Sequence, residues 1–181
     1  PPFSPGELAL GAQARFFARV GGGSPKEMGQ IFIEAQQFKG TSLIEILQNC
    51  VIFNDGCFNH LTDKDVKEDK QIFLEHGKPM IFGKNRDKGL VLKGLKLEVV
   101  TIGENGVTQE DLLVHKKKKK DPTLHYMLVR MEYPLATGVI RSFDDVTLEE
   151  REDELTAQVK ANSSFTKTDD LFFSGETYEV K

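Results

Sequence analysis

The sequence predicts an α/β fold: a parallel sheet flanked by helices, followed by an antiparallel hairpin or meander and by C-terminal helices. Three observations carry this prediction. The chain begins with a strand, helix, strand order, apolar runs separated by glycine follow, and a capped helical pattern comes last. With 181 residues, 39% of them hydrophobic and 29% charged, the chain is long enough for one domain with a substantial core.

Residues 14–20, ARFFARV, are a short apolar run that predicts the first strand. The loop GGGSP follows, and Ser24 suits the N-cap of a helix that begins at Pro25. Glu27 lies three residues after Ser24, the spacing of a capping box. Gly40 marks the end of this helix. Its predicted buried face consists of Met28, Ile31, Phe32, Ala35 and Phe38.

Residues 41–47, TSLIEIL, predict the second strand. A strand, helix, strand order with short loops implies a right-handed crossover and parallel pairing of the two strands. Ligands of open α/β sheets bind beyond the carboxyl ends of such strands. Cys50, in the stretch LQNCVIFND, follows one of these ends directly.

The middle of the chain is more charged and less apolar than the segments before it. Residues 62–77 are highly charged with few apolar positions, which predicts a short surface helix. Residues 79–101 contain apolar runs separated by GKNRDKG and KG, the pattern of an antiparallel hairpin or meander. The glycines of GENG, residues 103–106, predict a closing turn.

The last third combines three kinds of segment. Residues 108–115 and 123–131 predict helices, and residues 136–143 predict a strand that returns to the core. Thr147 and Glu150 form a second capping box, at the start of LEEREDELTAQVKA. Beyond residue 162 the tail lacks periodicity, but its apolar side chains indicate that it docks on another surface. These are Phe165, Leu171, Phe172 and Phe173.

Composition excludes several classes of function. Acidic residues outnumber basic ones 28 to 24, giving a net charge of −4, which argues against nucleic acid as a partner. No apolar run approaches the roughly 20 residues of a membrane span, and the N-terminus lacks the pattern of a signal peptide. Two cysteines make no disulfide framework, so a reducing, cytoplasmic setting is expected. The missing Met before Pro1 predicts that the chain begins inside a longer protein.

Cys50 has two interpretations when only the residues are considered. Free cysteines are among the most buried residue types, so a small buried side chain is the favoured interpretation and a ligand is the alternative. Cys57 and His60 follow Cys50, but the spacing lacks the second paired half of a zinc site. We therefore expect no zinc, and we interpret Cys57 as structural.

Other candidate residues give weaker signals. His76, His115 and His125 accompany no recognisable nucleophile motif, so they are interpreted as surface or core residues. The GGGSP loop precedes a helix N-terminus that could receive a phosphate, but it has neither P-loop nor dinucleotide-binding spacing. A strand-to-helix turn explains its glycines.

Five consecutive lysines run from Lys116 to Lys120, against the acidic balance of the chain. Like charges in a row repel one another and resist burial, so an exposed loop is the simplest interpretation. The alternative is a patch that attracts an acidic protein or an anionic cofactor. The sequence leaves both open.

Three blocks of sequence together resemble a known family. FSPGELALGAQARFFARV, FKGTSLIEILQNCVIFNDG and LEHGKPMIFGKNRDKGLVLKGLKLEVVTIGENG occur in the order found in the beta subunit of 2-oxoacid:ferredoxin oxidoreductases, in its C-terminal half. These enzymes oxidise pyruvate or 2-oxoglutarate to acyl-coenzyme A. The resemblance extends from about Phe3 to Ile140, interrupted at the lysine run.

The resemblance implies a thiamine-diphosphate type of domain and an iron-sulfur ligand. In the family a 4Fe-4S cluster is held by three cysteines of the N-terminal half and by a fourth in the segment matching LQNCVIFND, which makes Cys50 the implied ligand. Backbone N–H groups of the same turn are suitable donors to the sulfurs. One thiolate cannot hold four irons, so the other ligands must lie outside these 181 residues.

The family binds thiamine diphosphate and Mg2+ through a Gly-Asp-Gly motif, which this sequence lacks. With the missing Met, this predicts a truncated or proteolysed product, or one part of a split subunit. The implied partners are the alpha subunit, ferredoxin, coenzyme A and a 2-oxo acid. The resemblance also implies three regions: residues 1–60 from the cofactor domain, an extension at 61–161, and an irregular tail at 162–181. The alternative function is a non-catalytic α/β interaction module that lacks cofactors.

Overall fold

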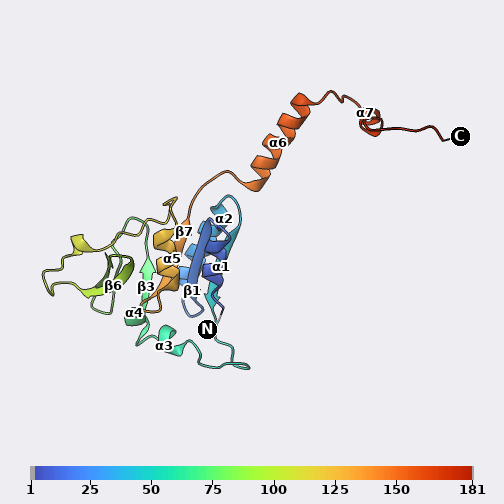
Figure 1. Cartoon of the computed structure of the whole chain (residues 1–181). Coiled ribbons are helices and arrows are strands. Elements are labelled where there is room, and N and C mark those ends of the chain that lie inside the picture. Colours follow the sequence, from blue (N-terminus) through green and yellow to red (C-terminus); the bar gives the residue numbers. More distant parts are fainter. Residues whose placement is uncertain (1–2, 181) are drawn as a thin grey trace. The chain divides into compact units, whose positions relative to one another are not determined.

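The computed structural model describes residues 3–180. The chain divides into two compact units, Pro1–Asp144 and Asp145–Lys181. The first unit contains a four-stranded sheet and a three-stranded sheet (Figure 1). The four-stranded sheet has the order β2 (Ser42–Leu47), β1 (Phe16–Gly21), β7 (Leu135–Ser142), β3 (Gln71–Leu74). The three-stranded sheet has the order β4 (Ile81–Phe82), β5 (Lys88–Lys93), β6 (Lys96–Thr101).

The four-stranded sheet is mixed, and parallel pairs dominate it. β1 pairs parallel with β2, as the strand, helix, strand pattern predicts, and β3 pairs parallel with β7. β7 runs antiparallel to β1, so the two parallel pairs point in opposite directions. β4, β5 and β6 form the predicted antiparallel meander. The predicted α/β class, with an added antiparallel sheet, is confirmed.

The core lies on both faces of β1, because alternate side chains of a strand point to opposite faces. Phe16, Ala18 and Val20 pack with Ile31 of helix α2 (Pro25–Gln37) in one cluster. Phe17 belongs to the other cluster, which helices α1 (Pro5–Gly11) and α5 (Thr123–Arg130) cover. All six residues of β1 are buried, so this strand forms the centre of the unit.

β1 also buries a charge. Arg19 is 5% exposed, and its Nε donates to Glu45 Oε2 on the neighbouring strand β2 at 2.6 Å. Its Nη2 donates to the carbonyl of Val129 at 3.5 Å. A buried guanidinium is tolerated when a carboxylate lies within hydrogen-bonding distance, so this pair also ties β1 to its parallel neighbour.

Helix α2 forms where predicted, but two details of the prediction are wrong. Ser24 is the N-cap residue but makes no capping hydrogen bond, because its hydroxyl accepts from Lys67 Nζ at 2.6 Å. Glu27 pairs with the same ammonium group at 3.0 Å, so the capping box does not form. Phe32 is 44% exposed and lies off the buried face, whose centre is Ile31.

The predicted surface helix over residues 62–77 is wrong. This part of the chain contains two single-turn helices, α3 (Asn59–Thr62) and α4 (Lys67–Lys70), followed directly by strand β3. Ile72 and Leu74 are buried, and the intervening Phe73 is 37% exposed on the other face. This alternation is that of a strand, and pairing with β7 outweighs the helical preference of the charged residues before it.

The helix predicted over residues 108–115 is also wrong, because only one turn of 3-10 helix forms, Gln109–Asp111. The chain then becomes extended beside the meander. Leu113 donates its backbone N–H to the carbonyl of Leu90, and its own carbonyl accepts from the N–H of Met80, at 2.9 and 2.8 Å. These long-range hydrogen bonds replace the local ones of a helix.

The second unit contains the helices α6 (Leu148–Asn162) and α7 (Thr168–Phe172) (Figure 1). The second predicted capping box is confirmed: Glu150 N donates to Thr147 Oγ1 at 3.1 Å and Thr147 N to Glu150 Oε2 at 2.8 Å. The apolar side chains of the tail are exposed, Phe172 to 76%. Their docking on another surface stays a prediction. No helix among residues 3–180 combines the length and apolar character needed to cross a bilayer.

Candidate functional site

Two loops meet at the carboxyl edge of the parallel pair β1 and β2. The loop after β1 contains three consecutive glycines, and Gly22 donates its N–H to the carbonyl of Leu47, the last residue of β2, at 2.9 Å. A Cβ at Gly22 would lie 3.3 Å from that carbonyl oxygen. Glycine therefore lets the first loop pass close to the start of the second, which contains Cys50.

The second loop is a turn that its own side chains close. Asn49 Nδ2 donates to Asp55 Oδ1 at 2.7 Å, and Asn49 Oδ1 accepts the backbone N–H of Gly56 at 2.8 Å. The N–H of Asn54 donates to the carbonyl of Cys50 at 3.0 Å. Gly56 has a φ of +72°, a conformation that glycine adopts without strain. These contacts hold the backbone around Cys50 in one shape.

The thiol of Cys50 is exposed, so the interpretation of this residue as a small buried side chain is wrong. Backbone N–H groups of Phe53, Ile52 and Asn54 hydrogen bond to the sulfur and lower the pKa of the thiol below its ordinary value. Hydrogen bonds to an ionised sulfur favour the thiolate, which is the form that binds metals. The tip of the turn, Val51 to Phe53, is apolar and exposed, with Phe53 at 89%.

A lysine from the middle segment ties down the glycine loop. Lys67 Nζ lies between Ser24 Oγ, at 2.6 Å, and the Glu27 carboxylate, at 3.0 Å. Gln71 Nε2 donates to the carbonyl of Leu61 at 2.7 Å and fixes the same segment beside the end of β1. Sequence reasoning missed Lys67 because 43 positions separate it from Ser24 and no local pattern joins them.

Neither Cys57 nor His60 joins Cys50 in a metal site. Cys57 is a partly exposed free thiol, and His60 is exposed. Across residues 3–180, no three or more His, Cys, Asp or Glu side chains are grouped so as to hold a metal ion. The turn therefore offers one sulfur ligand.

His115 and His125 are core residues, each 1% exposed. His115 Nε2 lies 2.9 Å from the carbonyl of Val139, and His125 Nε2 lies 3.2 Å from that of Lys116. Because a carbonyl only accepts, each Nε2 carries the hydrogen. Burial lowers the pKa of both imidazoles to about 4, so both are neutral near pH 7 and serve to bind backbone carbonyls.

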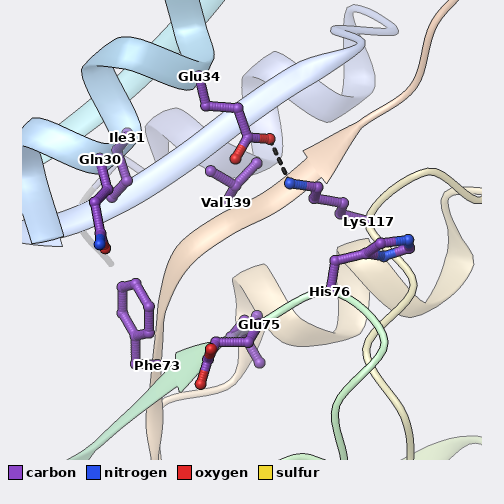
Figure 2. A pocket seen from close by; sticks show the side chains of 9 residues that line it. Gln30, Ile31, Glu34, Phe73, Glu75, His76, Lys117 and Val139 are labelled. Carbon is purple, nitrogen blue, oxygen red and sulfur yellow. Dashed lines mark hydrogen bonds and ion pairs between the residues drawn. The ribbon is translucent and has the colours of Figure 1, made fainter.

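A separate hollow of about 300 Å³ lies where helix α2, the end of β3 and the lysine run meet (Figure 2). Lys117 Nζ pairs with Glu34 Oε1 at 2.6 Å across its wall, and His76 and Glu75 line it from the chain after β3. Cys50 is not among its lining residues. Sequence reasoning missed this hollow, because its walls come from four segments that lie far apart in the chain.

Comparison with known proteins agrees with the sequence blocks described above. The chain is 34% identical over 161 residues to the 2-oxoglutarate oxidoreductase subunit KorB of Mycobacterium tuberculosis, a match that covers 88% of this chain and 42% of KorB. No protein-family model matches the chain.

A solved structure gives the same fold. It is the 2-oxoglutarate:ferredoxin oxidoreductase from Magnetococcus marinus with 2-oxoglutarate, coenzyme A and succinyl-CoA bound. The superposition has a TM-score of 0.58 at 15% identity and covers 97% of this chain and 45% of the other. This chain thus spans less than half the length of both proteins. The predicted resemblance is confirmed: the chain is related to part of a subunit of the 2-oxoglutarate oxidoreductases.

Proposed function

We propose that this chain is part of the beta subunit of an oxidoreductase that oxidatively decarboxylates a 2-oxo acid to acyl-coenzyme A and passes the electrons through a 4Fe-4S cluster to ferredoxin. The proposal rests on the relationship to KorB over most of the chain. Both proteins compared carry 2-oxoglutarate in their names, which favours this substrate over pyruvate. The alpha subunit, ferredoxin and coenzyme A are the proposed partners.

Cys50 fits the role of a cluster ligand. A 4Fe-4S cluster takes thiolate ligands and accepts and releases single electrons, and hydrogen bonds to sulfur tune its potential. Cys50 presents an exposed thiol whose pKa is lowered by three backbone N–H groups, on a turn that Asn49 holds rigid. This geometry supports the assignment of Cys50 within the proposal. The other ligands belong to the rest of the subunit, because the turn supplies one sulfur.

The described residues do not fit the anchoring part of a thiamine diphosphate and Mg2+ site. The chain lacks Gly-Asp-Gly, and residues 3–180 hold no group of carboxylate and imidazole side chains suited to a metal ion. We therefore assign these cofactors to the rest of the subunit. The part proposed for this chain is to hold the cluster sulfur at the carboxyl edge of β1 and β2.

The test is Cys50→Ser in the complete subunit, with Cys57→Ser as the matched control. A serine hydroxyl is a much weaker ligand for cluster iron than a thiolate, so iron content and the visible absorbance of the cluster should fall, while the control keeps both. Unchanged iron in the Cys50 variant would refute the assignment. A complete subunit that binds neither iron nor thiamine would instead support the alternative, a non-catalytic interaction module.

A further inference from the structure

The lysine run from Lys116 to Lys120 is an exposed loop whose backbone is anchored to the core. We call these five residues the lysine platform. Four of their five carbonyls accept hydrogen bonds from the body of the unit. His125 Nε2 donates to Lys116 O at 3.2 Å, and the N–H of Ser142, in β7, donates to Lys117 O at 2.9 Å.

Arg141 holds the other end of the platform. Arg141 is 6% exposed, and its guanidinium donates from Nη1 to Lys119 O and from Nη2 to Lys120 O, both at 3.0 Å. The Nη1 group also lies 3.1 Å from His125 Nδ1, and the guanidinium stacks on Phe143. By binding two lysine carbonyls, the buried arginine fixes the backbone so that the like-charged lysines stay close together. In a loop without these hydrogen bonds, repulsion would move the lysines apart.

Among residues 3–180, acidic side chains form ion pairs with two of the five lysines. Lys117 pairs with Glu34, as Figure 2 shows, and Lys118 pairs with Asp144 at 3.2 Å. Lys116, Lys119 and Lys120 are exposed, and among residues 3–180 no ion pair involves them. The platform therefore presents three ammonium groups that form no ion pair within residues 3–180, with Asp121 as an acidic neighbour of Lys119, on an anchored backbone.

We propose that the lysine platform is a docking site for an acidic segment of a partner protein. Carboxylates brought against the three free lysines relieve their mutual repulsion. Because Arg141 and His125 already order the backbone, binding costs less conformational entropy than it would on a mobile loop.

Nucleic acid fits this surface less well. Phosphate-backbone sites need an extended basic face, and single-stranded sites add aromatic platforms for the bases. Here Glu34, Asp144 and Asp121 lie among the lysines or border them, and Phe143 is covered by Arg141. A short acidic peptide, which needs only a few ammonium groups, suits the platform better.

The platform lies at the opposite end of the sheet from Cys50. Ser142, which binds Lys117, pairs with Phe16 at the start of β1, whereas Leu47, just before the Cys50 turn, pairs with Gly21 at its end. At about 3.3 Å per residue, the six-residue strand separates them by roughly 17 Å. A partner docked here leaves the edge with Cys50 open, so this inference does not depend on the proposed function.

The test measures binding of a fluorescein-labelled decaglutamate peptide to the full chain by fluorescence anisotropy at low salt. The variant Lys116→Ser, Lys119→Ser, Lys120→Ser should bind about tenfold more weakly, because it removes the three free charges. The control variant changes three exposed lysines elsewhere by the same charge: Lys39→Ser, Lys64→Ser and Lys96→Ser. It should retain affinity within about twofold.

Circular dichroism checks that the triple variant is folded. If it is not, the single variant Lys119→Ser, which keeps every anchored carbonyl, should show a smaller loss in the same direction. Equal losses in the platform and control variants would overturn the proposal, since the peptide would then respond only to net charge. Tighter binding of a labelled oligothymidine than of decaglutamate would also overturn it, in favour of a nucleic-acid site.

Discussion

At the scale of single residues, burial decides the chemistry of the two core histidines. Residue type alone makes His115 and His125 candidates for proton transfer, since the ordinary pKa of an imidazole lies near neutrality. In the structure each donates its Nε2 hydrogen to a backbone carbonyl, of Val139 and Lys116 respectively. They are structural donors, and their positions hold the segment after residue 114 against the core.

The low pKa of these histidines makes the stability of the first unit depend on pH. In the folded state both are neutral down to about pH 4, whereas in the unfolded chain they take up protons below their ordinary pKa of 6.5. The unfolded state therefore binds more protons between these values, and the free energy of unfolding should fall by a few kcal/mol as the pH drops from about 6.5 to about 4. Urea unfolding at a series of pH values measures this fall.

A matched pair of variants isolates the two imidazoles. His115→Gln keeps an N–H donor for the carbonyl of Val139 but cannot titrate, so the pH dependence should become about half as steep. His125→Gln keeps an N–H donor for the carbonyl of Lys116 and should reduce the steepness in the same way. A wild-type chain whose stability stays constant over this range would contradict the expectation.

At the scale of elements, the junction between β3 and β7 depends on one glycine. Gly138 has a φ of +93° and pairs with Leu74, the last residue of β3. A Cβ at this position would lie 2.9 Å from the carbonyl oxygen of Leu74. At this last pair the observed spacing between β3 and β7 therefore leaves no room for a side chain on β7.

We expect Gly138→Ala to lower the free energy of unfolding by about 2 kcal/mol, through the left-handed backbone and the close contact together. Gly23→Ala is the control, because its added Cβ would meet no atom within 4 Å. Chemical denaturation compares the two variants. Equal stability of both would show that β3 moves away from β7 without cost.

The same junction shows why sequence reasoning failed in the middle of the chain. Three apolar residues, Ile72 to Leu74, follow a charged stretch. This pattern is compatible both with the surface helix that we predicted and with a short strand. Their partner, β7, begins more than 60 positions later, so only pairing with it selects the strand. The 14–20 and 41–47 strands were predictable because a helix that starts at Pro25 and has a periodic apolar face lies between them.

At the scale of the whole molecule, the chain matches less than half the length of the proteins to which it is related. The cysteine turn is well formed by its own hydrogen bonds, yet it supplies one sulfur. The proposed 4Fe-4S cluster needs further ligands, so this turn by itself does not supply a complete cluster site.

We therefore expect the purified 181-residue chain, expressed alone, to contain far less iron than one cluster per chain and no thiamine diphosphate. Iron analysis beside chromatographic assay of thiamine, with an intact mass to establish the chain ends, measures this. Coexpression with the remaining part of a KorB-like subunit should raise the iron content. A stoichiometric cluster in the chain by itself would contradict the expectation.

Features that depend on neighbouring residues could be read from the sequence: the β1, α2, β2 order, the meander, the Thr147 capping box and the place of Cys50 after a strand. Local periodicity, caps and turns encode these directly. Three other features became visible only in the fold: the antiparallel pairing of β7 with β1, the hydrogen bond from Lys67 to Ser24, and the hydrogen bonds from Arg141 to the lysine platform. Each of these joins residues more than 20 positions apart, and burial and pairing between distant segments leave no periodic trace in the sequence.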